Sequence, residues 1–294
     1  MGLKVGLNYR MKYYSKFINQ SIKGKSHIKN DLPCQDKTYF IDNKNVRVIS
    51  LSDGAGSCKY SDLGAEIATK VCADYVSKNF EKIYNDLDNE KVGKKLFKKI
   101  IDQIKIEFED RKLDSEKEDN VNEVEKVSLQ KKNHPKIVIE DYSSTLLFTA
   151  FFDGKYISGH IGDGLICISD EDLKIHSNPE NGDTPNSTYF FTTKNAEKHL
   201  RLKKGIISKN TTFVLMSDGT YECIYDKKEN KFTNALVKFI DWVSNGKEKE
   251  VSDAIKLNME KHFLNKTSDD CSIAIMHIFI VKSIFDKVSE FFKN

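Results

Sequence analysis

The residues of this chain with the clearest chemical potential are aspartates at the ends of apolar segments. Four apolar stretches with the character of strands each begin or end at an aspartate. Three of these aspartates precede a glycine, in Asp53-Gly54, Asp163-Gly164 and Asp218-Gly219, and the fourth stretch begins after Asp269-Asp270. A fifth aspartate, Asp36, comes just before the strand-like stretch 38–41. Rigid strands can hold carboxylates in fixed positions, and a following glycine lets the chain turn sharply or approach a ligand closely.

Several carboxylates that converge without histidine or cysteine form a site in which every ligand is an oxygen. Such a site suits Mg²⁺ or Mn²⁺ better than zinc, and two such ions about 3.5–4 Å apart favour in-line attack on phosphorus. A single Asp-Gly is more often a turn than a ligand, and Asp153-Gly154 is predicted to be only a hairpin turn. Asp53 and Asp218 differ because both follow apolar segments directly.

The elements that would position these aspartates come in blocks. Residues 46–52 predict a strand, and apolar residues at helical spacing predict helices from Ser61 and after Asn89. Strands are predicted at 143–152, 155–162, 165–169 and 212–216, helices at 232–243 and 251–263, and a last strand at 271–281. This order predicts a layered α+β fold rather than a doubly wound α/β sheet.

Composition excludes several classes of protein. The chain has 294 residues, and its 47 Lys and Arg against 44 Asp and Glu leave a net charge of +3, a small basic excess for a nucleic-acid-binding domain. The longest apolar stretch, 271–281, is too short to cross a membrane, and the basic N-terminus lacks the apolar core of a secretory signal. None of the six cysteines forms a CxxC pair. We therefore expect a cytoplasmic monomer with reduced thiols and no nucleic-acid or membrane partner.

In their order along the chain, these motifs resemble the metal-dependent Ser/Thr protein phosphatases of type 2C, the PPM family. The resemblance runs from about Gly24 to Val281 and rests on five fragments in family order: Gln35-Asp36, SLSDGAG, SSTLL with GHIGDG, VLMSDG and DDCSIAI. It is nearest to a bacterial branch whose first motif reads G-x-S-H…P-C-Q-D, here Gly24-Lys25-Ser26-His27 and Pro33-Cys34-Gln35-Asp36. The resemblance implies a four-layer α-β-β-α sandwich of two packed, mainly antiparallel sheets.

The resemblance also implies which residues hold metal. Asp53 would bridge two Mg²⁺ or Mn²⁺ ions, and Gly54 would offer one of them its backbone carbonyl. Asp218 and Asp269 would hold the first ion. Asp269 is expected to be the ligand rather than Asp270, because the family pattern has Asp first and then Asn or Asp.

Two further aspartates and a histidine complete the implied site. Asp36 would act at the second ion, largely through bound waters, and Asp163 matches an acidic position linked to a third, weaker ion. His27 stands nearest to the place where many members carry a phosphate-binding arginine; a structural histidine bonded to the backbone is the alternative. Ala55 replaces a histidine proposed as general acid in eukaryotic members, so the leaving group must take its proton from water or elsewhere.

The implied activity is hydrolysis of phosphoserine and phosphothreonine in proteins by a metal-activated water, without a phosphoenzyme. The implied partners are a phosphorylated protein and a cognate Ser/Thr kinase. Two alternatives stay open: a catalytically weak or inactive member that regulates a partner by binding metal or phosphoprotein, and a hydrolase of small phosphate esters.

The catalytic domain is expected to span residues 14–281. Within it, the charged stretch 109–136 predicts a mobile insertion, with a continuation of the preceding helix as the alternative for its first half. Residues 174–208 are predicted to form a flap, in which the aromatic residues 189–191 are either flap contacts or a core strand. Residues 282–294 predict an amphipathic helix packed on the domain.

Overall fold

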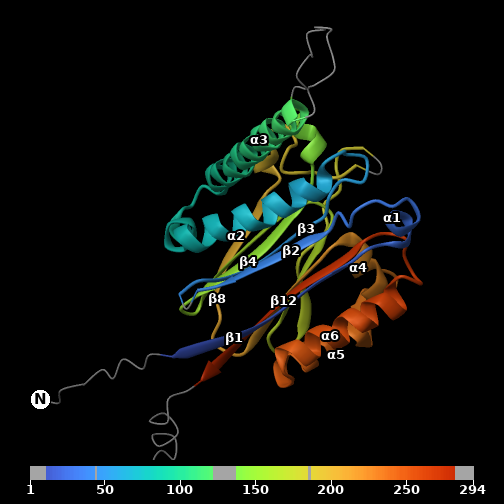
Figure 1. The fold of residues 1–294 in the computed structure, drawn as a ribbon. Helices are drawn as coiled ribbons and strands as arrows, with labels where there is room; N and C mark the ends of the chain where they lie inside the picture. The colour runs from blue at the N-terminus through green and yellow to red at the C-terminus, as the bar shows by residue number, and fades with distance from the viewer. Residues whose placement is uncertain (1–10, 44, 122–136, 185–186, 282–294) are drawn as a thin grey trace, which may run out of the picture.

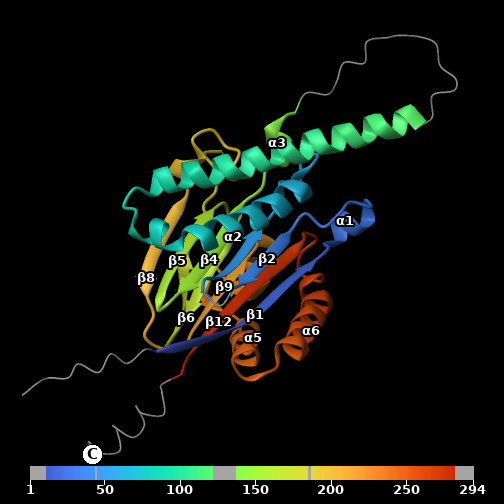
Figure 2. The same cartoon turned by 60° about the vertical axis from the view of Figure 1, so that its left-hand side comes forward.

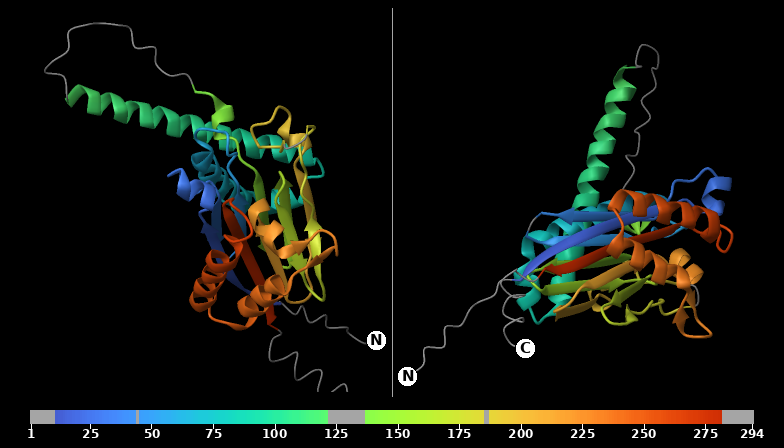
Figure 3. Two further views of the ribbon diagram at one scale, coloured as in Figure 1. Left: turned by 90° about the vertical axis from the view of Figure 1, so that its right-hand side faces the viewer. Right: turned by 90° about the horizontal axis from the view of Figure 1, so that it is seen from below.

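The computed structural model describes residues 11–43, 45–121, 137–184 and 187–281 (Figure 1). Two five-stranded sheets pack face to face, and helices cover the outer face of each sheet (Figures 1 and 3). Neighbouring strands within both sheets pair antiparallel. The predicted α+β class and the four-layer α-β-β-α sandwich are therefore confirmed.

The sheets draw their strands from different parts of the chain. The first sheet has, in order, β1 (Lys12–Ile22), β12 (Cys271–Val281), β9 (Thr211–Met216), β6 (Leu165–Ser169) and β7 (Leu173–Ser177). The second sheet has β2 (Lys37–Asp42), β3 (Arg47–Ser52), β4 (Leu146–Phe152), β5 (Lys155–Ile161) and β8 (Arg201–Ile206). A small hairpin is formed by β10 (Tyr225–Asp226) and β11 (Lys231–Phe232).

Two long helices cover the second sheet and two shorter helices cover the first (Figure 2). The long pair is α2 (Ser61–Asn85) and α3 (Asn89–Val121), and the short pair is α5 (Asn234–Asn245) and α6 (Glu248–Asn258). Smaller helical segments are α1 (Lys25–Lys29), η1 (Ile139–Tyr142), η2 (Ala196–Lys198), α4 (Asp218–Ile224) and η3 (Met259–Phe263). Across the ranges described above, no helix is long and apolar enough to cross a membrane.

Burial on both faces explains why the central strands are unbroken apolar runs. In β4, Leu147 and Phe151 belong to the core between the two sheets. Leu146, Phe148 and Ala150 alternate with them and pack against the layer of α2 and α3. A strand of this kind needs apolar side chains at consecutive positions, since neither face meets water.

The turn between β4 and β5 is the hairpin turn that the sequence predicts. Phe152 pairs with Lys155, and the two residues between them, Asp153 and Gly154, have φ angles of 44° and 81°. Positive φ at both central positions matches the right-handed twist of the paired strands, and Asp-Gly suits this turn. Asp153 therefore belongs to a turn.

Three of the four edge strands were not predicted from the sequence, whereas the fourth, β2, corresponds to the strand-like stretch 38–41. The strand β1 was not expected, and the predicted flap at 174–208 needs correction at both ends, because β7 and β8 are strands of the two sheets. Each of β1, β7 and β8 lies at a sheet edge and has one strand partner. Their polar composition reflects this partial exposure and hides the strand pattern.

The predicted insertion at 109–136 is also partly corrected. The helix α3 continues to Val121, which is the alternative proposed for the first half of this stretch, and Figure 2 shows it running past the sheets on the side of α1. The remainder of the insertion, 122–136, lies outside the described residues, and so does the predicted amphipathic helix at 282–294.

Candidate metal centre

The topology brings the five predicted aspartates to one end of the sandwich. The strands β3 and β5 both run antiparallel to β4, so Asp53 and Asp163 follow strands that end on the same side. Asp36 precedes β2, which is antiparallel to β3 and begins on that side. In the other sheet, Asp218 follows the end of β9, and Asp269 precedes the beginning of its antiparallel neighbour β12.

A cavity of about 180 Å³ lies among these strand ends. Its lining includes the predicted residues Asp53, Gly54, Asp163, Asp218, Asp269 and His27. The other lining residues are Gln35, Ala55, Gly56, Thr145, Thr188 and Phe190. Of these, Gln35 and Ala55 lie in the sequence motifs and Phe190 in the predicted aromatic patch, whereas Thr145 was not indicated as a site residue. Asp36 is absent from this lining because its side chain is almost wholly buried, with 1 % exposure.

The surroundings of Asp36 leave its carboxylate without a partner. Neither of its oxygens has a hydrogen-bond partner within the described residues. Burial, together with the charges of Asp270 and Asp218, raises the pKa of Asp36 from its ordinary value of 3.8 to about 7, although the nearby Ser217 and Ser272 hydroxyls act against this rise. A buried and unpaired carboxylate is costly for the fold, so this position favours a bound cation.

The two central aspartates repel one another in the same way. Burial raises the pKa of Asp53 well above its ordinary value, and the charges of Asp36 and Asp218 raise it further. Burial and the charge of Asp163 raise the pKa of Asp218 to about 6. Two contributions oppose this rise: a side-chain hydrogen bond with Asp53, and the Gly219 N–H, which donates to Asp218 Oδ1 at 2.6 Å. A divalent cation would relieve this repulsion, since it favours the ionised form of every carboxylate near it.

The consecutive aspartates before β12 have different surroundings. Asp270 is 2 % exposed, accepts the N–H groups of Gly24 and Gln35 at 2.6 Å each, and has Oδ2 at 2.9 Å from His27 Nδ1. Asp269 is exposed and lines the cavity, and its Oδ1 accepts the N–H of Asp270. Asp270 thus has both oxygens committed to the protein, whereas Asp269 is available to a ligand.

Gly54 and Gly219, which follow the two central aspartates, serve close packing rather than a left-handed turn. Within the described ranges, positive φ occurs at Gly154 and Gly162 among the glycines, but not at Gly54 or Gly219. A Cβ at Gly219 would lie 2.2 Å from the Asp270 carbonyl oxygen. Glycine here therefore allows the two strand ends of the first sheet to approach each other.

The predicted aromatic patch 189–191 divides between the site and the core. Phe190 lines the cavity, whereas Phe191 is buried in the layer of α2 and α3. The neighbouring Thr188 hydroxyl donates a hydrogen bond to Asp163 Oδ2. Both interpretations of this patch hold in part, because one residue faces the carboxylates and the next fills the core.

Arg201 on β8 joins this segment to the turn that carries Asp163, a role that the sequence did not indicate. Its guanidinium donates to the carbonyl oxygen of Gly162 at 3.3 Å and to that of Asn178, and Nε lies 2.9 Å from Glu180 Oε2. The Glu180 N–H also donates to the Gly162 carbonyl at 3.0 Å. These contacts link strand ends that are distant in sequence, so no local pattern predicts them.

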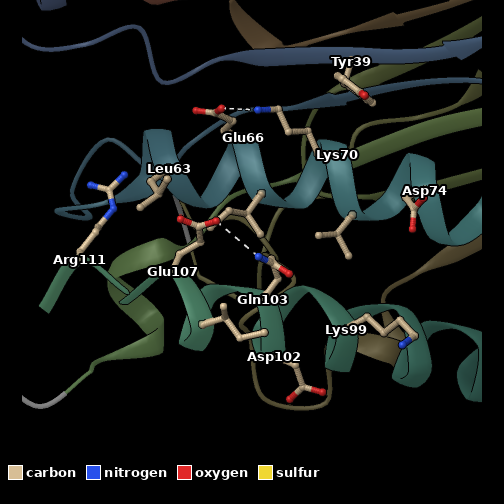
Figure 4. A pocket seen from close by; sticks show the side chains of 13 residues that line it. Tyr39, Leu63, Glu66, Lys70, Asp74, Lys99, Asp102, Gln103, Glu107 and Arg111 are labelled. Carbon is tan, nitrogen blue, oxygen red and sulfur yellow. Dashed lines mark hydrogen bonds and ion pairs between the residues drawn. The ribbon is translucent and has the colours of Figure 1, made fainter. Parts of the chain in front are cut away.

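A larger cavity elsewhere contains none of the predicted site residues. It has a volume of about 670 Å³ and lies between α2 and α3, with Tyr39 of β2 at its side (Figure 4). Its charged side chains are partly paired with one another: Lys70 Nζ lies 2.5 Å from Glu66 Oε1, and Gln103 donates to Glu107 at 3.4 Å. The smaller cavity among the strand ends is therefore the candidate site.

The donor set of the smaller cavity fits hard divalent cations. Its candidate side-chain ligands are all carboxylates, one of them has no partner, and their charges oppose one another. Among the residues that the structure describes, no three Asp, Glu, His or Cys side chains already surround one point. The carboxylates would therefore have to rotate inward around an ion.

The comparisons with known proteins agree with the fold. Residues 23–259 match a family model described as protein phosphatase 2C. The chain belongs to the protein phosphatase 2C family. The family named from the sequence motifs is thereby confirmed, whereas the specific bacterial motif stays a prediction. No relative was found among curated protein sequences.

Several solved phosphatases share the fold of this family member. The catalytic domain of the Ser/Thr phosphatase PstP, solved with two manganese ions, has 11% identity and a TM-score of 0.53, over 91% of this chain and 100% of that chain. A bacterial serine phosphatase has 13% identity and a TM-score of 0.54, over 90% and 98%. The S. agalactiae serine/threonine phosphatase has 15% identity and a TM-score of 0.52, over 90% and 99%. At these identities the likeness establishes the fold alone.

Proposed function

We propose that this phosphatase 2C family member is an active Mg²⁺- or Mn²⁺-dependent enzyme that hydrolyses phosphoserine and phosphothreonine in proteins. The observation that carries the proposal is the convergence of four aspartates on one cavity, beside the buried and unpartnered Asp36. Family membership supports the reaction class, and the solved structure of PstP with two manganese ions supports the metal.

The residues that would hold two ions are the ones implied by the motifs, Asp36, Asp53, Gly54, Asp218 and Asp269, with Asp163 at a third. When bound, such ions supply a nucleophilic water at neutral pH and neutralise charge on the phosphoryl group. The protein's own part is to hold the carboxylates in place. The Asp53 N–H donates to Thr145 Oγ1 at 3.0 Å, and the Thr145 N–H donates to the Asp53 carbonyl at 2.8 Å, so β4 fixes the end of β3.

The size of the cavity supports a macromolecular substrate. At about 180 Å³ it is smaller than the roughly 300–1,000 Å³ typical of sites that enclose a small molecule. We infer that it accepts a phosphoryl group while the rest of the substrate lies on the surface around Phe190. This placement fits a phosphorylated protein. From the sequence we further propose a monomeric cytoplasmic phosphatase that opposes a Ser/Thr kinase.

Hydrolysis assays with p-nitrophenyl phosphate and a phosphothreonine peptide, in Mn²⁺ or in EDTA, test the proposal. We expect turnover that requires metal and is lost in Asp53→Asn. The matched control is Asp153→Asn, which changes an aspartate of the same Asp-Gly type at the hairpin turn and should leave the rate unchanged. Undiminished activity in EDTA would overturn the two-metal mechanism. Metal binding without turnover would instead favour a regulatory, inactive family member.

A further inference from the structure

The first part of α3 presents a surface rich in lysine. Residues 89–108 contain six lysines against three acidic residues, an excess as large as the net charge of the whole chain. The apolar residues of this stretch, such as Leu96 and Ile100, are buried in the core beneath α2 and α3, whereas the lysines between them are exposed. Four of these lysines line a cavity of about 390 Å³, which we call the basic groove: Lys91, Lys94, Lys95 and Lys98.

Two of the four lysines lie near acidic partners. Asp86 Oδ2 lies 3.3 Å from Lys91 Nζ, and Glu197 Oε1 of η2 lies 4.0 Å from Lys94 Nζ. Exposed ion pairs at such distances are weak and are screened by salt. A ligand with negative charge can therefore compete for both lysines.

The other two lysines of the basic groove have no such partner. Among the ion pairs of the described residues, none involves Lys95 or Lys98. The remaining acidic lining residues, Asp88 and Glu90, stand at the N-terminus of α3, where negative charge is favoured, and Asp88 Oδ1 accepts the Lys91 N–H at 2.9 Å. The ammonium groups of Lys95 and Lys98 are thus available to a negatively charged ligand.

A short segment joins the basic groove to the candidate metal centre. Phe190 lines the cavity among the strand ends, and Glu197 lines the basic groove. Successive turns fold the chain between them, since the Thr193 N–H donates to the Phe190 carbonyl and the Ala196 N–H to the Thr193 carbonyl, each at 3.0 Å. Figure 2 shows this part of the chain, which leads into β8, beside the first part of α3; there a Cβ at Gly93 would lie 3.3 Å from Glu197 Cα.

The length of this segment limits the distance between the two cavities. Even a fully extended chain from Phe190 to Glu197 would span at most about 25 Å, because one residue covers about 3.3–3.6 Å. A substrate peptide whose phosphoryl group lies beside Phe190 can therefore reach the basic groove within about seven residues.

We propose that the basic groove of α3 binds acidic side chains of the substrate, so that this protein acts on phosphoserine and phosphothreonine within acidic sequences. This inference rests on the proposed phosphatase function. Each ion pair at an exposed surface is weak, so the four lysines act together, and their effect is on the binding of the substrate rather than on the reaction at phosphorus. The connection to Phe190 favours a protein segment over a membrane surface.

Two phosphothreonine peptides of equal length test the proposal. One carries glutamates about four to seven positions before and after the phosphothreonine, and the other carries glutamines there. With Mn²⁺ at low ionic strength, we expect the wild type to have a KM about tenfold lower for the glutamate peptide, with similar kcat. The preference should shrink at high salt. It should be lost in Lys95→Glu/Lys98→Glu, which should still hydrolyse p-nitrophenyl phosphate at the wild-type rate.

A matched control reverses two exposed lysines that cover the other sheet. Lys238→Glu/Lys249→Glu, on α5 and α6, makes the same change in net charge and should keep the preference for the glutamate peptide. Equal loss of the preference in both double variants would overturn the proposal, because net charge alone would then explain it. A wild type without any preference would also overturn it. If the α3 variant does not fold, Lys95→Gln/Lys98→Gln takes its place and should weaken the preference.

Two measurements without turnover complete the test. The unphosphorylated glutamate peptide should bind the wild type more tightly than it binds Lys95→Glu/Lys98→Glu, and equal binding would overturn the proposal. If the wild type binds this peptide but shows no metal-dependent hydrolysis of p-nitrophenyl phosphate, the proposed phosphatase function fails while the basic groove stands. Binding to phosphatidylserine vesicles that is lost in the α3 variant, without a preference between the two peptides, would overturn the proposal in favour of a membrane surface.

Discussion

Asp36 and Asp270 are both buried at the same end of the sandwich, yet their surroundings are opposite. Asp270 accepts two backbone N–H groups and faces His27, so its burial is compensated by hydrogen bonds. Asp36 has no hydrogen-bond partner within the described part of the chain. The difference separates a carboxylate that holds the loops together from one that the fold keeps ready for a ligand.

This comparison also predicts opposite energetic roles. A satisfied buried carboxylate stabilises the fold, and removing it leaves donors unpaired. An unsatisfied one destabilises the fold until a cation arrives, as is common at functional sites where stability is lost in favour of activity. Substitutions at the two positions therefore test whether Asp36 and Asp270 contribute to stability with opposite sign.

The largest effect is expected for Asp36→Asn. With Mn²⁺ present, activity should fall by at least roughly 10–100-fold, since even groups that act through the first ligands have effects of this size. The metal-free protein should become more stable by about 1–3 kcal/mol at pH 7.5, because a buried charge is removed. Chemical denaturation in EDTA measures the second effect, and a less stable variant would contradict the assigned role of Asp36.

A somewhat smaller effect of opposite sign is expected for Asp270→Ala. The N–H groups of Gly24 and Gln35 would lose their acceptor, and His27 would lose the carboxylate that lies 2.9 Å from its Nδ1. The free energy of unfolding of the metal-free protein should fall by about 2–4 kcal/mol, since each buried donor left unpaired costs about 1–3 kcal/mol. Denaturation curves collected beside those of Asp36→Asn provide the comparison; equal changes at both positions would remove the distinction.

The pH dependence of stability gives a further test of the unfavourable burial of Asp36. Native Asp36 and Asp218, with pKa values of about 7 and about 6 against 3.8, bind more protons than the unfolded chain between pH 4 and pH 7. Their contribution to stability is therefore present below about pH 4 and is lost as the pH rises through 6–7. The stability difference between Asp36→Asn and the wild type, both metal-free, should grow over this interval, and a constant difference would contradict it.

Buried histidines act in the other direction, which is why a difference measurement is needed. Burial lowers the pKa of His176 and of His277 to about 4, and that of His160 well below its ordinary value. These rings bind fewer protons in the native protein than in the unfolded chain, so their contribution rises with pH up to about 6.5. Both proteins share this contribution, and it cancels.

The smallest effect is expected for Thr188→Val, which removes a hydrogen bond to Asp163. The environment of Asp163 is intermediate between those of Asp36 and Asp270. Asp163 accepts one hydroxyl hydrogen bond and lines the cavity. Loss of this bond should change stability by no more than about 1 kcal/mol and should alter the Mn²⁺ concentration for half-maximal rate by about threefold to tenfold. A Mn²⁺ titration of the rate measures the shift. The control is Thr211→Val, which also loses one hydroxyl hydrogen bond but lies at the end of β9 opposite Asp218.

Much of the site could be predicted because its signals are local. An aspartate at the end of an apolar strand, as at Asp53 and Asp218, is visible in the sequence, and antiparallel pairing then brings such ends together. The central strands were equally visible, since burial on both faces demands continuous apolar residues. The edge strands β1, β7 and β8 were not, because one free edge tolerates polar residues.

The remaining features depend on contacts between distant segments. Apart from the family pattern, nothing local distinguishes Asp269 from Asp270. Their different surroundings arise only when the segment from Gly24 to Gln35 docks on the start of β12. The pairing of His27 with Asp270, and the contacts of Arg201, have the same origin. No pattern of period 2 or 3.6 encodes such contacts.

The pairing of β1 with β12 has a consequence for how the molecule is made. Lys12 pairs with Val281 and Ile22 with Cys271, so the edge of the first sheet joins the beginning of the chain to its far end. Contacts between residues so far apart in the sequence form late, and they reduce the rate of folding. During synthesis, β1 must wait unpaired until β12 leaves the ribosome, and Asp269 reaches its place only then. The end of the sandwich that carries the aspartates is thus completed last, so a chain without β12 also lacks a complete candidate metal centre.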